Sequence, residues 1–184
     1  MSRNPTGDTA DRGGHTTNIE HAPAFITREA RSDDFARYFD EGFAALGPES
    51  RMMRFFSPVN QLPDTVRQHL AEVDGVRNAA IIAFDTTATD EAHPEGRPVG
   101  VARWMEGEQG RPELSITVID DYQGMGVGSR LMDSLLVLAR RRGVRRIIAD
   151  VLRENTAMRA LINRYRAVVQ PSGDPRIVRY RIDV

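Results

Sequence analysis

A glycine-rich turn in the second half of the sequence has the composition of an anion-binding site. Glycines stand at alternate positions over residues 123–128, after an apolar segment and before an amphipathic one. Without side chains at these positions, successive backbone N–H groups can converge on an anion, and the positive end of the following helix dipole adds to the attraction. The turn therefore predicts a phosphate or pyrophosphate site. Its expected binding residues are Gln123, Gly124, Met125, Gly126, Val127, Gly128 and Ser129.

Two common phosphate-binding loops do not fit this turn. A Walker A loop needs Gly-Lys-Ser/Thr after its first glycines, and that run does not follow here. A dinucleotide fingerprint has the spacing G-x-G-x-x-G early in a β-α-β unit, whereas these glycines alternate late in the chain. From the residues alone, a glycine-rich turn without any ligand remains the alternative.

The same turn resembles a known family signature. The run from Gln123 to Gly128 matches the Gln/Arg-x-x-Gly-x-Gly/Ala signature of the GCN5-related N-acetyltransferases (GNAT), and the resemblance extends over about residues 26–184. It implies acetyl-CoA as co-substrate and direct attack of a primary amine on the thioester. It also implies an α+β, sandwich-like GNAT fold, with a mixed, mainly antiparallel central sheet of six to seven strands flanked by helices.

Three further segments resemble the bacterial Pat-type protein lysine acetyltransferases of this superfamily. These segments are residues 48–56, 121–124 and 163–168. The closer resemblance implies an amine acceptor that is a protein lysine, such as a lysine of an acyl-CoA synthetase. Three other interpretations stay open: a small-molecule amine N-acetyltransferase, a non-catalytic acyl-CoA-binding sensor and a plain nucleotide-binding module.

Glu113 is the candidate general base, because an attacking amine must lose a proton. It stands where the Pat-type enzymes have a glutamate, at the start of the segment that leads to the glycine turn. The five residues from Glu113 to Val118 span roughly 16 Å in a strand. A pantetheine arm that runs back from the pyrophosphate along this strand would end near Glu113. A solvated carboxylate beside Pro112 is the alternative.

Four other positions are candidates for binding acyl-CoA. The resemblance implies that Val118 and Ile119 present backbone groups to the pantetheine, with core packing as the alternative. It also implies that Asn155 faces the same arm, although a helix cap suits this position equally well. Arg130 is either a ligand of a nucleotide phosphate or an ordinary surface arginine.

The resemblance does not supply a general acid. Many GNAT members have a tyrosine seven residues after the asparagine, and this sequence has Ile162 at that position. Tyr165 lies three residues later, where a tyrosine more often packs in the core. Arg166 stands where family members commonly have glycine.

Periodicity predicts the elements that position these residues. Apolar runs predict strands at residues 25–30, 79–84, 99–104, 114–119, 147–152 and 177–182. Helical spacing predicts helices at about residues 32–46, 48–56, 63–73, 131–139 and 156–165, the first with Ser32 as N-cap. We expect residues 24–184 to form a single GNAT domain and residues 1–23 to form a disordered polar tail.

Composition argues against several other functions. With 25 basic and 26 acidic residues, the chain has no strong attraction for nucleic acid or anionic lipid. The absence of cysteine excludes disulfides, thiolate zinc sites and a cysteine acyl-enzyme. The four histidines lack ligand spacing, so no metal is expected. No apolar run approaches the roughly 20 residues that span a bilayer, and we expect a cytoplasmic protein without a membrane partner.

Five large apolar side chains are candidates for an acceptor groove. They are Met52, Met53, Phe55, Phe56 and Trp104. Clusters of methionine and aromatic residues belong to protein cores more often than to binding grooves, so core packing is the alternative for each of them.

Overall fold

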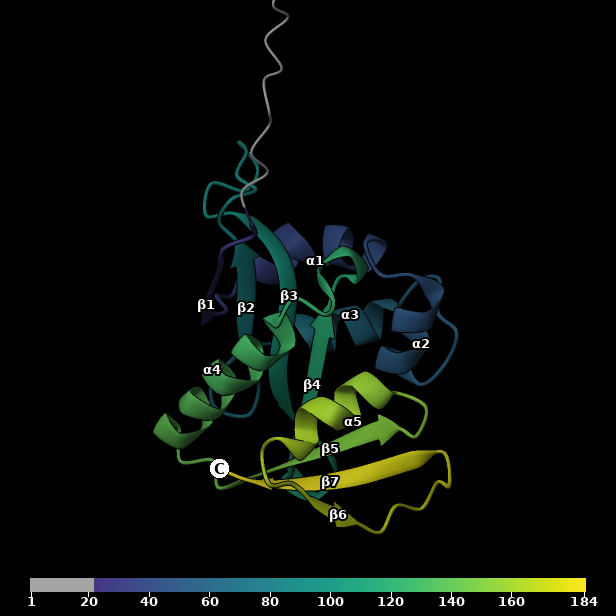
Figure 1. Ribbon diagram of the computed structural model, residues 1–184. Coiled ribbons are helices and arrows are strands. Elements are labelled where there is room, and N and C mark those ends of the chain that lie inside the picture. Colours follow the sequence, from purple (N-terminus) through teal and green to yellow (C-terminus); the bar gives the residue numbers. More distant parts are fainter. Residues whose placement is uncertain (1–21) are drawn as a thin grey trace, which may run out of the picture.

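The computed structural model describes residues 22–184 and contains one mixed sheet of seven strands (Figure 1). The strands are β1 (Phe25–Glu29), β2 (Ala79–Asp85), β3 (Arg97–Glu106), β4 (Pro112–Val118), β5 (Arg146–Leu152), β6 (Val168–Gln170) and β7 (Ile177–Asp183). Their order across the sheet is β1-β2-β3-β4-β5-β7-β6. All neighbours pair antiparallel except β4 and β5, which are parallel. This mixed, mainly antiparallel sheet confirms the predicted α+β class.

Five α-helices accompany the sheet in the described part of the chain. They are α1 (Asp34–Ala44), α2 (Pro48–Phe55), α3 (Asp64–Ala71), α4 (Val127–Arg141) and α5 (Thr156–Asn163). The predicted N-cap Ser32 is wrong, because α1 begins after Asp33. The turn before α1 is held instead by the Asp34 carboxylate, which accepts hydrogen bonds from the Arg31 N–H at 2.6 Å and from the Arg28 guanidinium at 2.6 and 2.9 Å.

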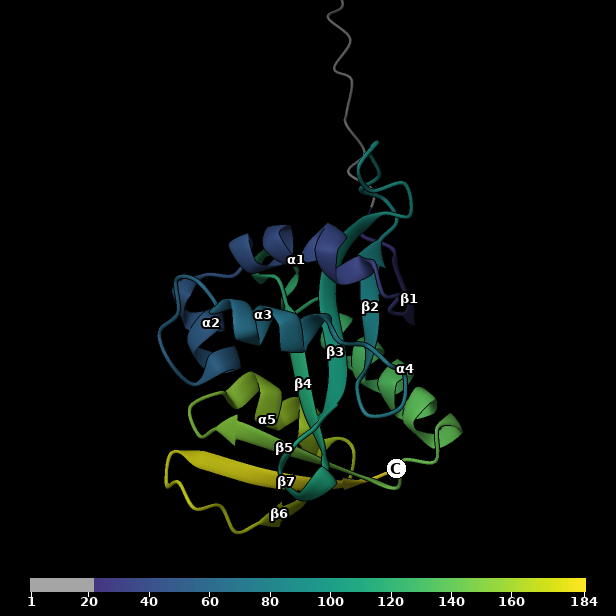
Figure 2. The same ribbon diagram turned by 180° about the vertical axis from the view of Figure 1, so that it is seen from behind.

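The helices cover opposite faces of the sheet (Figures 1 and 2). α4 packs across β1 to β4 on one face, whereas α1 and α2 contact β3 and β4 from the other. Leu131 and Leu135 of α4 recur at helical spacing and are fully buried in the main core. Under α1 there is a separate, smaller cluster of Tyr38, Ile82 and Phe84.

The parallel strands β4 and β5 are paired at only one end, and the resulting gap positions the candidate site. Glu113 and Ile148 are the one pair of residues in register between them. Beyond that pair β5 turns away from β4, as Figure 1 shows, and continues its ladder with β7. The β5-facing edge of β4 after Glu113 therefore borders a gap and not a neighbouring strand.

The sequence patterns missed β6, a three-residue strand that pairs with β7 at the edge of the sheet. Arg166, just before β6, has a φ of +52°, in the left-handed region that favours glycine. This conformation gives a physical reason for the glycine common at this position in the family. An arginine in this conformation destabilises the folded state by roughly 1–2 kcal/mol relative to glycine.

The predicted tail of residues 1–23 lies, apart from its last two residues, outside the described part of the chain. Within residues 22–184, none of the helices has the length and apolar character needed to cross a bilayer. The longest, α4, has 15 residues.

Candidate active site

The glycine turn joins β4 to α4 through two residues in the left-handed conformation. Gly124 and Gly126 have φ values of +76° and +84°, which strain any residue that carries a Cβ. A Cβ added to either glycine would meet no heavy atom of the described chain within 4 Å. The backbone conformation therefore requires these glycines, and the space in front of them is open to a ligand.

The first turn of α4 points unpaired N–H groups into that space. In residues 22–184 no side chain caps this helix at Gly126, and its first turn contains no acidic residue. The N–H groups of a helix start and its dipole attract an anion. Gly128 and Ser129 line the open space, whereas the Val127 side chain is buried in the core and Met125 is half exposed. These last two residues can contribute only their backbone.

Gln123 braces the turn from within. Its side-chain Nε2 lies 3.0 Å from Ser50 Oγ of α2, 3.1 Å from the Val118 carbonyl oxygen and 3.2 Å from Asp120 Oδ1. The amide group of Gln123 thus links the turn to β4 and to α2. In this structure the residue holds the shape of the glycine turn and also lines the open space.

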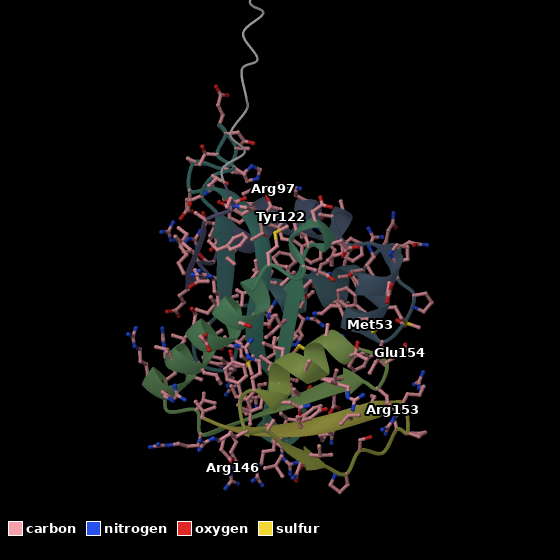
Figure 3. The ribbon with its side chains drawn as sticks, in the orientation of Figure 1. Met53, Arg97, Tyr122, Arg146, Arg153 and Glu154 are labelled. Carbon is pink, nitrogen blue, oxygen red and sulfur yellow. The ribbon has the colours of Figure 1, made fainter. Side chains whose placement is uncertain are left out.

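Tyr122, the residue before Gln123, anchors the start of the turn to the sheet. Its hydroxyl donates to Asp85 Oδ2 at 3.1 Å, and its ring makes an edge contact with Phe25 at 6.0 Å. Arg97 lies over the same ring, with its Cζ 6.0 Å from the ring centre, and Figure 3 shows the two side chains together at the end of the sheet. The start of the turn is therefore fixed to the sheet by Tyr122 and to α2 by Gln123.

Backbone hydrogen bonds decide which groups on the edge of β4 are free. The Ile119 N–H donates to the Val99 oxygen at 3.0 Å, and the Ile119 oxygen accepts from the Tyr122 N–H at 3.0 Å. In an antiparallel ladder these groups alternate between the two edges, so the Val118 N–H points toward the gap beside β5. Val118 is therefore placed for the predicted contact with an extended ligand, whereas both backbone groups of Ile119 are used within the fold.

Glu113 lies where the gap between β4 and β5 closes. It is in register with Ile148 of β5 and Met105 of β3, and its side chain is exposed. Its carboxyl group packs against Gly107, where an added Cβ would collide with it. Gly107 therefore makes room for the candidate base. Sequence reasoning missed this glycine, although it stands in the short turn just before the strand of Glu113.

Asn155 lies at the start of α5, beside the gap between β4 and β5. Its Oδ1 accepts a hydrogen bond from the Met158 N–H at 2.9 Å, which makes it the N-cap of α5. It also lines the cleft between β4 and β5. Helix capping fixes the side chain by its oxygen, so its NH2 group remains to contact a ligand in the cleft.

Tyr165 ties α5 to α4. Its hydroxyl donates to Asp133 Oδ1 at 2.7 Å and lies 3.3 Å from the Ser129 oxygen. Burial and the hydrogen bond to Asp133 raise the pKa of Tyr165 to about 12. The side chain packs against the main core and is not among the residues that line the cleft. The structure therefore gives Tyr165 a packing role, and Ile162 is fully buried.

A cleft of about 1080 Å³ connects the glycine turn, Val118, Asn155 and Glu113. It runs from the glycine turn through the gap to Glu113 and is bounded by α2 on one side and α5 on the other. Met53 of α2 and Glu154, which follows β5, both line it, and Figure 3 shows them on the side of the molecule where α2 and α5 approach each other. The volume is at the upper end of the roughly 300–1,000 Å³ that is usual for ligand sites.

The match to a family model decides which chemistry this cleft serves. The model described as the Acetyltransferase (GNAT) family matches residues 51–166, which include Glu113, the glycine turn and Asn155. The chain belongs to the GNAT family. It is therefore a member of a family of acyl-CoA-dependent N-acetyltransferases, as its glycine turn predicts.

Individual GNAT proteins support the same assignment. The chain is 32% identical over 119 residues to "Acetyltransferase PA5475" of Pseudomonas aeruginosa, an alignment over 63% of this chain and 60% of that protein. It is 52% identical over 56 residues to "Acetyltransferase Pat" of Mycolicibacterium smegmatis, over 30% of this chain and 17% of that protein. Both alignments cover less than two thirds of the relative.

A solved structure with the same GNAT fold is the GNAT domain of S. lividans PAT. It superposes with a TM-score of 0.73 and 26% sequence identity, over 86% of this chain and 89% of that one. This similarity confirms the GNAT fold that the sequence predicts.

The cationic side chain that lies beside the turn in this GNAT fold is one that the sequence did not point to. Arg130 is exposed and is not among the residues that line the cleft. Arg164, from the end of α5, does line it and donates through Nη1 to Ser129 Oγ at 2.9 Å. Only the packing of α5 against α4 brings Arg164 to the start of α4, and the sequence carries no local signal for it.

The predicted acceptor groove is partly wrong. Trp104 is fully buried beneath α4, on the face of the sheet away from α2, and belongs to the core. Met53, Phe55 and Phe56 line the cleft, whereas Met52 does not. The alternation of side chains along β3 explains Trp104, because its neighbour Arg103 occupies the other face.

Metal binding finds no support in the described part of the chain. Among residues 22–184 there is no group of three or more His, Cys, Asp or Glu side chains that could hold a metal ion. Two of the four histidines, His15 and His21, lie outside the described residues.

Proposed function

We propose that this protein transfers an acetyl group from acetyl-CoA to a primary amine by direct attack of the amine on the thioester. The observation that carries the proposal is the gap beside β4, which has the open N–H groups of the glycine turn at one end and Glu113 at the other. A diphosphate at the turn and a pantetheine arm along Val118 bring the thioester to Glu113.

In this proposal the turn binds acetyl-CoA through its backbone. The N–H groups of Gly124, Gly126, Gly128 and Ser129 surround the diphosphate, and the start of α4 adds a favourable field. Arg164, held beside Ser129, supplies a positive charge at the same place. Asn155 contacts the pantetheine arm from the opposite side of the gap.

Glu113 acts as general base in this proposal. The amine must be neutral to form its bond with the carbonyl carbon of the thioester, and the Glu113 carboxylate accepts the proton that the amine loses. The carbon–sulfur bond then breaks, and the coenzyme leaves as a thiolate that takes a proton from water. Tyr165 has no part in this step, because its hydroxyl is committed to Asp133 outside the cleft.

A protein lysine is the acceptor we favour, with a lysine of an acyl-CoA synthetase as the first candidate and the cytoplasm as the location. Support comes from the two comparison proteins that are named Pat. A small-molecule amine is the competing acceptor, since the same base serves any primary amine. Incubation of the protein and acetyl-CoA with a lysate, read by acetyl-lysine mass spectrometry beside a panel of small amines, separates the two.

The replacement Glu113→Gln tests the proposed base. It keeps the size of the side chain and removes its basicity, so we expect kcat/KM to fall at least about a hundredfold. The dissociation constant for CoA, measured by calorimetry, stays within about twofold of wild type. Glu154→Gln is the matched control, because Glu154 is another carboxylate of the same cleft. Equal activity of Glu113→Gln and wild type would remove the base assignment.

A second test concerns the turn alone. Replacing Gly126 by Val forces a β-branched residue into a φ of +84° and directs a side chain into the open space. CoA should bind at least about tenfold more weakly, while far-ultraviolet circular dichroism stays that of wild type. Undiminished affinity for CoA in this variant would place the coenzyme elsewhere and overturn the proposal.

A further inference from the structure

A small cavity beneath helix α1, which we call the side pocket, opens off the active-site cleft. It measures about 150 Å³, and its walls come from α1, the end of α2, α3 and the sheet. Its apolar wall includes Phe35, Phe39, Phe43, Leu70, Val73 and Ile82. Four residues line both the side pocket and the cleft: Arg54, Phe55, Ser115 and Thr117.

The side pocket lies on the face of the sheet that carries the candidate base. Side chains alternate between faces along a strand, so Glu113, Ser115 and Thr117 of β4 share one face. On β3, Arg103 pairs directly with Ser115 and diagonally with Glu113, which places the Cβ atoms of Arg103 and Glu113 roughly 7–8 Å apart. A group that Arg103 binds is therefore close to an amine that approaches Glu113.

Arg103 is buried in the wall of this pocket without a carboxylate. Its side chain is 6% exposed, and its Nη1 donates to the Leu70 carbonyl oxygen at 2.8 Å. Its Nε and Nη2 have no hydrogen-bond partner among the described residues. Buried charged groups are normally paired, because an unpaired one loses its hydration without compensation. The unpaired donors of Arg103 indicate a partner from outside the chain.

Arg54 of α2 brings a second positive charge to the same pocket. Its guanidinium lies 4.9 Å from the centre of the Phe55 ring. Burial lowers the pKa of Arg54 to about 10, and burial together with the charge of Arg54 lowers the pKa of Arg103 to about 10. Both side chains remain positive at neutral pH and repel each other. An anion between them removes that repulsion.

The other polar groups of the pocket do not neutralise this pair. The Asp34 carboxylate is engaged by the Arg28 guanidinium and the Arg31 N–H. Tyr38 lines the pocket with a buried hydroxyl that has no hydrogen-bond partner among residues 22–184. Arg31, which also lines the pocket, carries a positive charge and therefore cannot neutralise the pair. The pocket therefore presents positive charge and unpaired donors inside an apolar wall.

We propose that the side pocket binds a carboxylate of the amine acceptor, carried on a short apolar stem, and so selects acidic acceptors. The planar fork of a guanidinium matches the two oxygens of a carboxylate. The aromatic and aliphatic wall suits the stem, and a cavity of roughly 150 Å³ accommodates a group of about the size of benzene. The inference rests on the proposed function, because it names the class of acceptor that the same site takes.

The position of the pocket favours the acceptor as the source of this carboxylate. The coenzyme is expected at the glycine turn and along the β5-facing edge of β4, whereas the pocket lies under α1 on the face of the sheet. A second source of the same chemistry is a donor such as succinyl-CoA, whose acyl chain ends in a carboxylate. The experiment below separates the two.

Binding of phenylacetate to the full chain tests the pocket without any turnover. We expect phenylacetate to bind at least tenfold more tightly than phenylacetamide, which has the same shape and no charge. Arg103→Met should weaken the binding of phenylacetate at least tenfold and leave the affinity for CoA unchanged. The unchanged affinity for CoA also shows that the variant is folded. Arg54→Met, at the half-buried edge of the pocket, should act in the same direction, and the exposed Arg141→Gln on α4 should change nothing. Equal affinity for the acid and the amide would overturn the proposal.

Turnover identifies the source of the carboxylate. With acetyl-CoA as donor, a lysine peptide with a neighbouring glutamate should have a KM at least tenfold lower than its glutamine counterpart, and Arg103→Met should abolish the difference. A preference for succinyl-CoA over acetyl-CoA without discrimination between the peptides would assign the pocket to the donor and overturn the proposal. If phenylacetate binds at Arg103 and no acceptor is acetylated, the proposed function fails and the carboxylate site stands.

Discussion

Two arginines near helix α1, the partly buried Arg28 and the buried Arg103, differ in how their positive charges are compensated by other residues of the chain. Arg28 of β1 is held by two carboxylates, with hydrogen bonds of 2.6 and 2.9 Å to Asp34 and of 2.8 Å to Glu95. These hydrogen bonds raise the pKa of Arg28. Arg103 of β3 has one backbone oxygen and no carboxylate, and burial lowers its pKa to about 10.

This difference in charge compensation separates an arginine with a structural role from one that is available to bind a ligand. A buried ion pair is compensated by its own partners, and removing one of them leaves an uncompensated charge. Arg28 belongs to this kind, and its ion pairs join β1, the start of α1 and the loop before β3. Arg103 lacks such compensation within the described chain, and it borders a pocket that opens to the cleft.

The largest effect is expected from Asp34→Asn. Asp34 is 3% exposed and Arg28 only 17%, so the substitution leaves a buried guanidinium with half of its compensation. We expect the free energy of unfolding at pH 7 to fall by about 3 kcal/mol, measured by urea denaturation. Asp40→Asn on the same helix is the control, because the Asp40–Arg67 pair is exposed and its loss should leave stability nearly unchanged. Equal losses in both variants would contradict the comparison.

A smaller effect on stability is expected when the pH is lowered. Burial opposes ionisation of Asp34, but the hydrogen bonds from Arg28 and Arg31 outweigh it and hold the pKa of Asp34 below its usual value. The stabilisation is therefore present above the ordinary aspartate pKa of about 3.9 and is lost as the pH falls through the folded value. The difference in free energy of unfolding between wild type and Asp34→Asn should therefore decrease from about pH 5 to pH 2. A difference that is independent of pH would mean that the charge of Asp34 is not its cause.

The smallest effect is expected from Arg103→Met. This substitution removes an uncompensated buried charge and leaves the apolar stem, so the free energy of unfolding should change by less than about 1 kcal/mol, in either direction. Urea denaturation in buffer without carboxylates measures it. A loss as large as that of Asp34→Asn would show that Arg103 is structural, as Arg28 is, and would remove the contrast between them.

Much of the fold was predictable from periodicity. Strands at residues 79–84, 99–104 and 147–152 appear as β2, β3 and β5, each extended by one to four residues. Boundaries were less predictable where the backbone conformation of a single residue sets them. α4 begins at Val127 and not at residue 131, because the left-handed Gly126 starts the helix directly after the turn. The short edge strand β6 has too few residues for a periodic signal.

The candidate site likewise has features that could be predicted from the sequence and features that could not. The glycine turn could be found from the sequence, since its chemistry depends on neighbouring backbone groups and on φ values that only glycine adopts readily. The contacts of its individual residues were less predictable. Both backbone groups of Ile119 hydrogen-bond to Val99 and Tyr122, and the Gln123 side chain contacts Ser50 and Val118, which the sequence does not show.

The sequence by itself determined the family and the class of fold, through its resemblance to the GNAT signature, and the place of the glycine turn, through local spacing. Tertiary structure alone decided that Arg164 reaches the turn, that Gly107 makes room for Glu113, and that Arg54 and Arg103 meet in one pocket. The physical reason is distance along the chain. A charge is costly or useful according to what surrounds it in space. The surroundings of Arg103 come from helices α1, α2 and α3 and from the neighbouring strands, which only the folded structure brings together.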